Sequence, residues 1–113
     1  MPFLLTAPSS APVIISLLAP SSSVISVSWR PPLYANMPLI NYHLSLHPVN
    51  GEGHVIETDV SPNVTSWMFG QLIAGEAYKV RVAAVNMEGE GPAQEKTVAM
   101  PMPGNCKIID YYM

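Results

Sequence analysis

The side chains that come nearest to forming a metal site are His43, His47 and His54. His43 and His47 share one face of a predicted strand, but at a rise of ~3.3 Å per residue they lie about 13 Å apart, too far to share an ion. His47 and His54 would face each other, with Cβ atoms about 5 Å apart, if residues 50–51 form a two-residue hairpin turn. No third ligand is evident. We therefore predict exposed histidines on the outer face of a sheet and no bound metal.

The glycines of residues 88–92, Glu-Gly-Glu-Gly-Pro, suggest a second kind of site, a phosphate-binding loop. Such a loop normally leads into a helix whose N-terminus holds the anion. Here Gly89 and Gly91 lead into Pro92 and a further predicted strand. Glu88 and Glu90 flank the glycines and would repel phosphate. The motif therefore predicts a β-turn rather than a nucleotide site.

Nothing in the sequence indicates a catalytic nucleophile. The serines fall in predicted linkers and on the outer face of predicted strands, and no nucleophile elbow is present. The single cysteine, Cys106, excludes an internal disulfide and a cysteine-rich zinc site. We predict no enzyme activity and no cofactor for this segment, although a parent protein could carry a separate catalytic domain.

Residues 63–65, Asn-Val-Thr, form an N-glycosylation sequon in a predicted exposed loop. A used sequon would place Asn63 in an extracellular or secreted protein. Short sequons also arise by chance, so an intracellular module stays open as the alternative.

Composition excludes several other classes of function. Charged residues make up 12% of the 113 residues, and the formal net charge is −3. The five basic residues are scattered, so the clustered charge that phosphate neutralisation needs is missing, and we expect no nucleic-acid partner. No apolar run approaches the ~20 residues of a membrane span, so we expect no membrane contact by this segment. Residues 1–11 have no basic flank like that of a signal peptide and predict a linker.

Seven strands are predicted, and no segment has a convincing helical period. Proline is abundant, with 12 residues, which favours short strands separated by turns. The expected strands are 13–18, an edge strand, and 24–29, 40–47, 54–60, 65–69, 78–86 and 94–100. Their spacing is typical of a β-sandwich.

Alternation of apolar and polar residues predicts which side chains face the core. The expected inward positions are Ile25, Val27, Trp29, Ile40, Tyr42, Leu44, Leu46, Trp67, Phe69, Tyr78, Val80, Val82 and Ala84. The register of the hairpin after residue 47 stays open. A two-residue turn would put Leu46 opposite Val55, whereas a one-residue bulge would turn Ile56, Thr58 and Val60 inward.

Over residues 9–100 the chain resembles a fibronectin type III domain. The resemblance rests on Val-Ser-Trp at 27–29 followed by Pro31-Pro32, on Tyr42, and on two longer patterns. These are Leu72-x-x-Gly75-x-x-Tyr78-x-Val80-x-Val82-x-Ala84-x-Asn86 and Gly89-x-Gly91-Pro92. Gln71 and Ala74 stand where the family usually has Gly and Pro, but Gly75 still supplies the turn residue.

The resemblance implies an all-β, immunoglobulin-like sandwich of seven antiparallel strands, with A, B and E in one sheet and C, C′, F and G in the other. It implies a domain at residues 12–101, followed by a linker or tail at 102–113. Tyr78 corresponds to the tyrosine corner, whose hydroxyl reaches back to the backbone near Leu72. The expected core and corner residues are Trp29, Tyr42, Trp67, Leu72, Tyr78, Val80 and Val82.

Exposed apolar residues at one end of the sandwich are the expected place for a protein partner. Leu33, Tyr34 and Met37 belong to the predicted B–C loop, and Ala83 and Val85 are expected to face outward on strand F. Met87, Glu88 and Glu90 complete the candidate contact residues in the F–G loop.

The expected function is that of a non-catalytic structural and protein-interaction module. We expect a spacer or adhesion domain, with its termini at opposite ends, in the extracellular part of a cell-surface receptor or matrix protein. Its expected partners are unidentified proteins and neighbouring domains of the same chain. The chain has no Arg-Gly-Asp and no Trp-Ser-x-Trp-Ser motif, which argues against the integrin-binding and cytokine-receptor modules of the family. The alternative is an intracellular scaffold module of a cytoskeletal or muscle filament protein.

Overall fold

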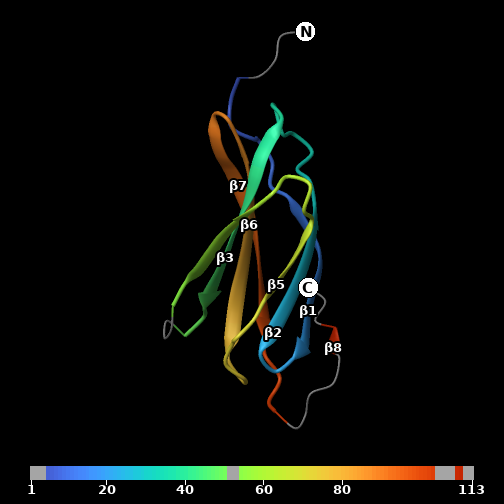
Figure 1. Ribbon diagram of the computed structural model, residues 1–113, viewed down its shortest axis with the longest axis vertical. Helices are drawn as coiled ribbons and strands as arrows, with labels where there is room; N and C mark the ends of the chain where they lie inside the picture. Colours follow the sequence, from blue (N-terminus) through green and yellow to red (C-terminus); the bar gives the residue numbers. More distant parts are fainter. Residues whose placement is uncertain (1–4, 51–53, 104–108, 111–113) are drawn as a thin grey trace.

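Two antiparallel sheets pack face to face in the computed structural model (Figure 1), which describes residues 5–50, 54–103 and 109–110. One sheet has the order β5-β2-β1-β8, formed by Ser66–Phe69, Val24–Arg30, Val13–Ser21 and Ile109–Asp110. The other has the order β4-β3-β6-β7, formed by Ile56–Val60, Leu39–Pro48, Ala77–Asn86 and Gly89–Ala99. The described residues contain no helix. The seven-stranded sandwich expected from the sequence is confirmed, with β1, β2 and β5 as strands A, B and E.

The short strand β8 is an addition to the expected seven. Its two residues pair with β1, Asp110 opposite Leu18 and Ile109 opposite Ala19. β1 was expected to be an edge strand, and this pairing covers two positions of its edge. Part of the segment expected to be a tail therefore returns to the sandwich.

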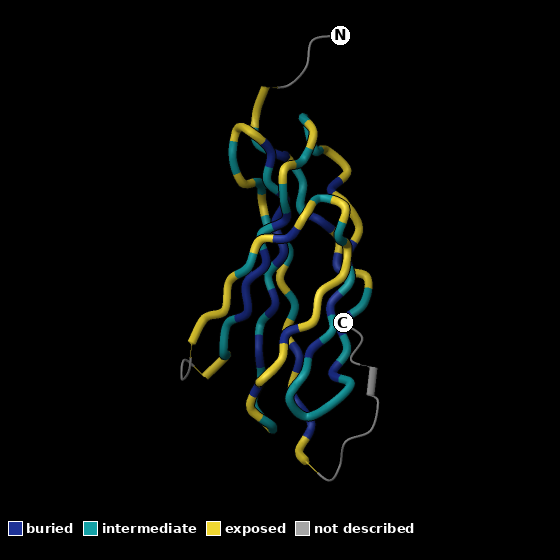
Figure 2. Tube along the Cα trace, in the orientation of Figure 1, coloured by how far each residue is buried: buried dark blue, intermediate teal, exposed yellow. Residues whose placement is uncertain are grey.

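The core lies between the sheets, where the buried parts of the strands gather (Figure 2). There Trp29 of β2 meets Tyr42 of β3. Their ring centroids are 5.4 Å apart and their planes are inclined at 69°, an edge-to-face contact. Tyr42, Leu44 and Leu46 are fully buried, as the alternation on β3 predicts. Ile25 and Val27 are fully buried on β2, and Val80 and Val82 on β6.

Three expectations about burial are wrong, each for a local reason. Ile40 is 52% exposed because a bulge between Leu39 and Asn41 interrupts the alternation. Trp67 is 38% exposed because β5 is an edge strand, paired only with β2, so one side of its side chain stays open. Ala83 is fully buried on the outer face, since its small side chain lies in the middle of a sheet between β3 and β7.

The β3–β4 hairpin takes the register with the extra residue. Leu46 lies opposite Ile56, Leu44 opposite Thr58 and Tyr42 opposite Val60. Only Val60 of these β4 residues is fully buried. The register is shifted by one residue from the one that would pair His47 with His54, so the geometry proposed for a two-histidine metal grip is absent.

The turn before β6 has the form of a tyrosine corner. The hydroxyl of Tyr78 accepts a hydrogen bond from the Ile73 N–H at 3.0 Å. Leu72 is buried, and its N–H donates to the carbonyl of Ser23 at 3.0 Å. Gly75 has φ of 80°, a conformation that glycine adopts without the steric penalty of a Cβ atom. The corner thus fixes the turn between the two sheets.

Candidate functional site

The loop between β2 and β3 and the β6–β7 hairpin lie at the same end of the sandwich, which we call the loop end (Figures 1 and 2). Three of the residues expected to contact a partner are strongly exposed there: Leu33 at 80%, Tyr34 at 59% and Met87 at 77%. Met37 is half-buried. Ala83 does not contribute, because it is buried in the sheet.

The two glutamates of this end differ in what they contact. Glu88 is exposed, and its N–H donates to the Asn86 side chain at 2.9 Å. Glu90 lies back along β7, where its carboxylate is 3.3 Å from the Arg81 guanidinium. The loop end therefore presents an apolar surface with Glu88 beside it, while Glu90 belongs to the face of the sheet.

Asn86, the last residue of β6, joins three segments at this end. Its side chain is 1% exposed and donates to the carbonyl of Thr6 at 2.8 Å and to that of Ala35 at 3.0 Å. Its oxygen accepts the Glu88 N–H. A buried amide satisfied in this way fixes the hairpin, the β2–β3 loop and the N-terminal segment relative to one another. From the sequence, Asn86 was identified only as a member of the family pattern.

The outer face of β3, β4 and β6 holds a cluster of ionisable side chains. The Nδ1 of His43 lies 2.6 Å from the Asp59 carboxylate, and its Nε2 lies 3.0 Å from that of Glu57. The hydrogen bond to Asp59 raises the pKa of His43, partial burial opposes this, and Glu57 and Glu90 add to the rise. The sequence did not reveal this cluster, because the β3–β4 register was open.

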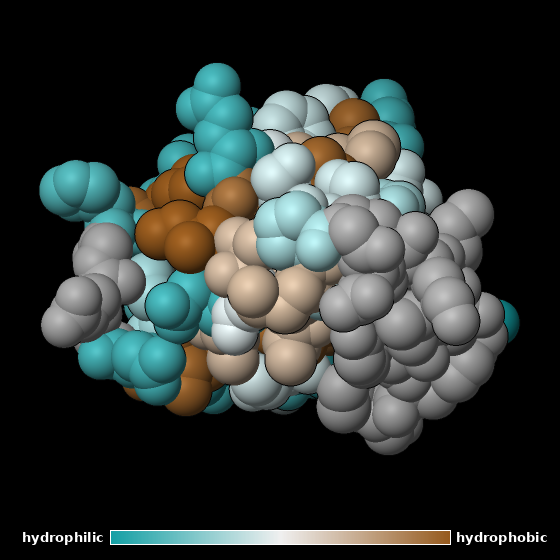
Figure 3. Space-filling view, turned by 90° about the horizontal axis from the view of Figure 1, so that it is seen from below, coloured by the Kyte–Doolittle hydropathy of each residue, from teal (hydrophilic) through white to brown (hydrophobic). Residues whose placement is uncertain are grey.

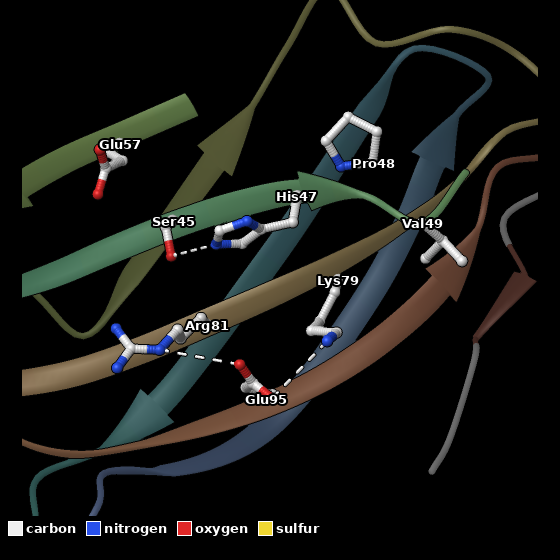
Figure 4. A pocket seen from close by; sticks show the side chains of 8 residues that line it. All are labelled: Ser45, His47, Pro48, Val49, Glu57, Lys79, Arg81 and Glu95. Atoms are coloured by element: carbon white, nitrogen blue, oxygen red, sulfur yellow. Dashed lines mark hydrogen bonds and ion pairs between the residues drawn. The ribbon is translucent and has the colours of Figure 1, made fainter. Parts of the chain in front are cut away.

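Beside this cluster is a polar hollow of about 380 Å³ (Figure 4). Its lining residues are Ser45, His47, Pro48, Val49, Glu57, Lys79, Arg81 and Glu95. Glu95 lies 3.9 Å from Lys79 and 3.8 Å from Arg81, and the Nε2 of His47 lies 3.1 Å from the Ser45 hydroxyl. Two cations and two carboxylates share the hollow, so its charge favours neither an anion nor a cation.

Metal-ligating residues do not converge in the described part of the chain, where no group of three His, Cys, Asp or Glu could hold an ion. Cys106 lies outside the described residues. The same part of the chain has no helix long and apolar enough to cross a membrane.

The sequon is open to modification. Asn63 and Thr65 are both exposed in the loop between β4 and β5. The Asn63 N–H donates to the Ser61 hydroxyl at 3.2 Å and the Val64 N–H to the Ser61 carbonyl at 2.9 Å, which forms a tight turn. The Asn63 side chain is thus presented on a short, ordered loop.

This arrangement, two sheets ordered β5-β2-β1 and β4-β3-β6-β7 with a tyrosine corner and open end loops, defines an immunoglobulin-like sandwich domain. The chain belongs to the fibronectin type III domain family, whose model matches residues 8–100. Domains of this family are non-catalytic modules.

Known relatives and structures agree with this assignment. The chain is 34% identical over 96 residues to the mouse proto-oncogene tyrosine-protein kinase ROS, covering 85% of this chain and 4% of that protein. It is 37% identical over 87 residues to the protein sevenless of Drosophila melanogaster, covering 76% of this chain and 3% of that protein. The fn3 domain of the human collagen alpha-1(XX) chain superposes with a TM-score of 0.75 at 25% identity, covering 88% of this chain and 92% of that one.

Proposed function

We propose that this chain is a spacer and protein-contact domain in the extracellular part of a cell-surface receptor or matrix protein. The observation that carries the proposal is the similarity to short segments of much longer proteins, of which this chain spans only 3–4%. A module that is so small a part of its relatives acts through its position in a series of domains. One of these relatives is named as a tyrosine-protein kinase, and catalysis in such a parent belongs to another domain.

The exposed sequon supports the extracellular side of this proposal. Glycosylation requires that Asn63 be accessible with Thr65 two residues later, and both residues are exposed. The mixed-charge face around Glu95 and Arg81 keeps the sheet surface hydrated. The apolar loop end is left as the surface for protein contacts.

Location of the natural protein tests this proposal. An antibody raised against the 113-residue chain is applied to intact and to permeabilised cells that make the parent protein. We expect staining of intact cells, or of the surrounding matrix. Treatment with an N-glycosidase should remove a glycan from Asn63 of the parent, and Asn63→Gln should reduce the mass that the enzyme releases by one glycan. Staining only after permeabilisation, together with no response to glycosidase, would contradict the proposal and favour the intracellular scaffold.

A further inference from the structure

β5, Ser66–Phe69, is an edge strand that pairs with β2 alone among the described strands, so its other side is open. Ser66, Trp67 and Met68 are all exposed, and Figure 2 shows this exposed run along β5. The pairing with β2 has no shift in register, so no bulge turns the edge away. An open edge of this kind presents unpaired N–H and C=O groups to which a strand of another molecule can bind.

The other edges of the two sheets have features that oppose such pairing. β4 has the charged side chains Glu57 and Asp59, and β7 has Pro92 and a shift in its register against β6. The edge of β1 is covered at two positions by β8. Charges, prolines, bulges and covering segments are the usual protection of edge strands. β5, with the sequence Ser-Trp-Met-Phe, has none of these features among the described residues.

The composition of the chain around β5 favours association. Residues 64–69, Val-Thr-Ser-Trp-Met-Phe, contain no charged residue, proline or glycine, and most of them favour β-strands. Uncharged segments of about six such residues associate readily where their backbone is open. The Thr65 carbonyl accepts the Trp29 N–H at 2.9 Å, so the extended backbone begins before Ser66.

Apolar side chains are also exposed at the end of the sandwich that holds the turn before β6. Val49, Ile73 and Met102 are each more than half exposed there. Figure 3 views the domain from this end and shows apolar side chains at the centre and left of the described surface. These three residues lie outside the strands, so their backbone is not part of a sheet edge. At β5, by contrast, exposed apolar side chains coincide with an open edge that has no charge.

The sequon lies immediately before this edge. Asn63 is exposed in the loop that joins β4 to β5, and this loop crosses between the edges of the two sheets (Figure 1). Hydrogen bonds to Ser61 hold the turn in which Asn63 lies. The chain from Asn63 to Trp67 spans at most ~14 Å, even if fully extended. A glycan on Asn63 is therefore attached within a few sugar lengths of the exposed indole.

We propose that an N-linked glycan on Asn63 packs along the open side of β5, with a sugar ring against Trp67, and prevents a second copy of this chain from pairing with that edge. The proposal rests on the proposed function, because an N-linked glycan is added to secreted and cell-surface proteins. It gives the glycan a task on the domain itself, in addition to marking the chain as extracellular.

The chemistry of Trp67 suits a sugar ring. Its indole is 38% exposed and offers an apolar face beside water. The C–H groups of a pyranose ring can pack on this face while the sugar hydroxyls stay hydrated. Attachment at Asn63 keeps the sugar at a high effective concentration, so a weak contact persists. The bulk and hydration of the glycan then keep another strand away from an edge that has no charge of its own.

The contact is tested by the fluorescence of Trp67 in the 113-residue chain secreted from mammalian cells. Trp29 is buried, so acrylamide in the solvent quenches mainly Trp67. The quenching constant of the glycosylated chain should be about half that of Asn63→Gln or less, because a sugar ring covers one face of the indole. If Asn63→Gln is not secreted, enzymatic removal of the glycan from the folded protein makes the same comparison.

The protective role is tested by sedimentation velocity at rising protein concentration. The glycosylated chain should stay a monomer, whereas Asn63→Gln should shift toward the mass of a dimer. Adding Met68→Lys to Asn63→Gln should restore the monomer, because a lysine on an edge strand opposes pairing. Met87→Lys is the matched control, since Met87 is also an exposed methionine but lies at the loop end. Asn63→Gln with Met87→Lys should still associate.

A monomer in every unglycosylated variant would overturn the proposal. So would restoration of the monomer by Met87→Lys as well as by Met68→Lys, since the association would then not involve β5. A glycan on Asn63 that leaves the quenching of Trp67 unchanged would overturn this proposal alone. A secreted chain with no glycan on Asn63 would overturn it together with the glycosylation expected under the proposed function.

Discussion

The hydroxyl of Tyr78 and the N–H of Ile73 are joined by a 3.0 Å hydrogen bond that closes the turn leading into β6. The Tyr78 ring is 5% exposed and packs in the core, so one side chain connects the turn to both sheets. Without the hydroxyl, the Ile73 N–H would lose this acceptor, and a buried N–H without a partner is unfavourable.

Tyr78→Phe should therefore lower the free energy of unfolding by about 1 kcal/mol, the usual net contribution of one hydrogen bond. The ring stays in place, so the change reports the hydroxyl alone. Urea unfolding at equilibrium measures it. A stability equal to that of the natural chain would mean that water replaces the hydroxyl at Ile73.

Tyr42 is the opposite case, because its buried hydroxyl has no hydrogen-bond partner among the described residues. The indole N–H of Trp29 is also buried and has none there either. Burial raises the pKa of Tyr42, and the neighbouring Trp29 lowers it by less. Tyr42→Phe removes a buried polar group that has no partner, so unfolding free energy should stay within ~0.5 kcal/mol of the natural value or rise. The same urea titration tests this. A loss above about 1 kcal/mol would reveal a hydrogen bond to the indole.

The two tryptophans should differ in their contribution to stability although both are on the same sheet. Trp29 is 1% exposed and Trp67 is 38% exposed. Trp29→Ala should lower unfolding free energy by roughly 3–5 kcal/mol, as large-to-small core changes do. Trp67→Ala should lower it by roughly 1–2 kcal/mol, because less apolar area is buried. If Trp29→Ala does not fold, Trp29→Phe and Trp67→Phe make the same comparison. Equal losses of unfolding free energy at the two positions would contradict the predicted difference between the tryptophans.

The alternation of side chains between the two faces of a strand explains why most core residues could be predicted. Tyr42, Leu44 and Leu46 alternate with polar residues, and a pleated strand turns alternate side chains to opposite faces, so one assignment fixes all three. Ile40 and Trp67 could not be placed this way. The burial of each depends on a bulge or on a missing neighbouring strand, which are features of the sheet and not of the local sequence.

The candidate contact surface was predictable to a similar degree. Loops that follow successive antiparallel strands return to one of two ends, so the sequence alone assigned the loops of Leu33 and Met87 to the same end. The docking of residues 6–10 was not predictable, because it depends on a close approach of Pro8 to Gly91, 83 residues away, and on where two asparagine side chains point. Such contacts leave no periodic pattern in the sequence.

His43 should make stability depend on pH. Its pKa is raised in the folded protein by Asp59, Glu57 and Glu90, above the value near 6.5 of an unfolded chain. The folded state thus binds the proton more tightly than the unfolded state. The stabilisation is fully present below pH ~6.5 and is lost as the pH rises through the folded pKa. His43→Gln should therefore cost the most at pH 5.5–6 and progressively less toward pH 9, by thermal unfolding of both proteins at each pH. His54→Gln, at an exposed histidine, controls for the removal of an imidazole.

Two results would contradict the assigned ion pairs of His43. One is an NMR titration that places the pKa of His43 at or below 6.5. The other is a loss of stability in His43→Gln that grows with pH.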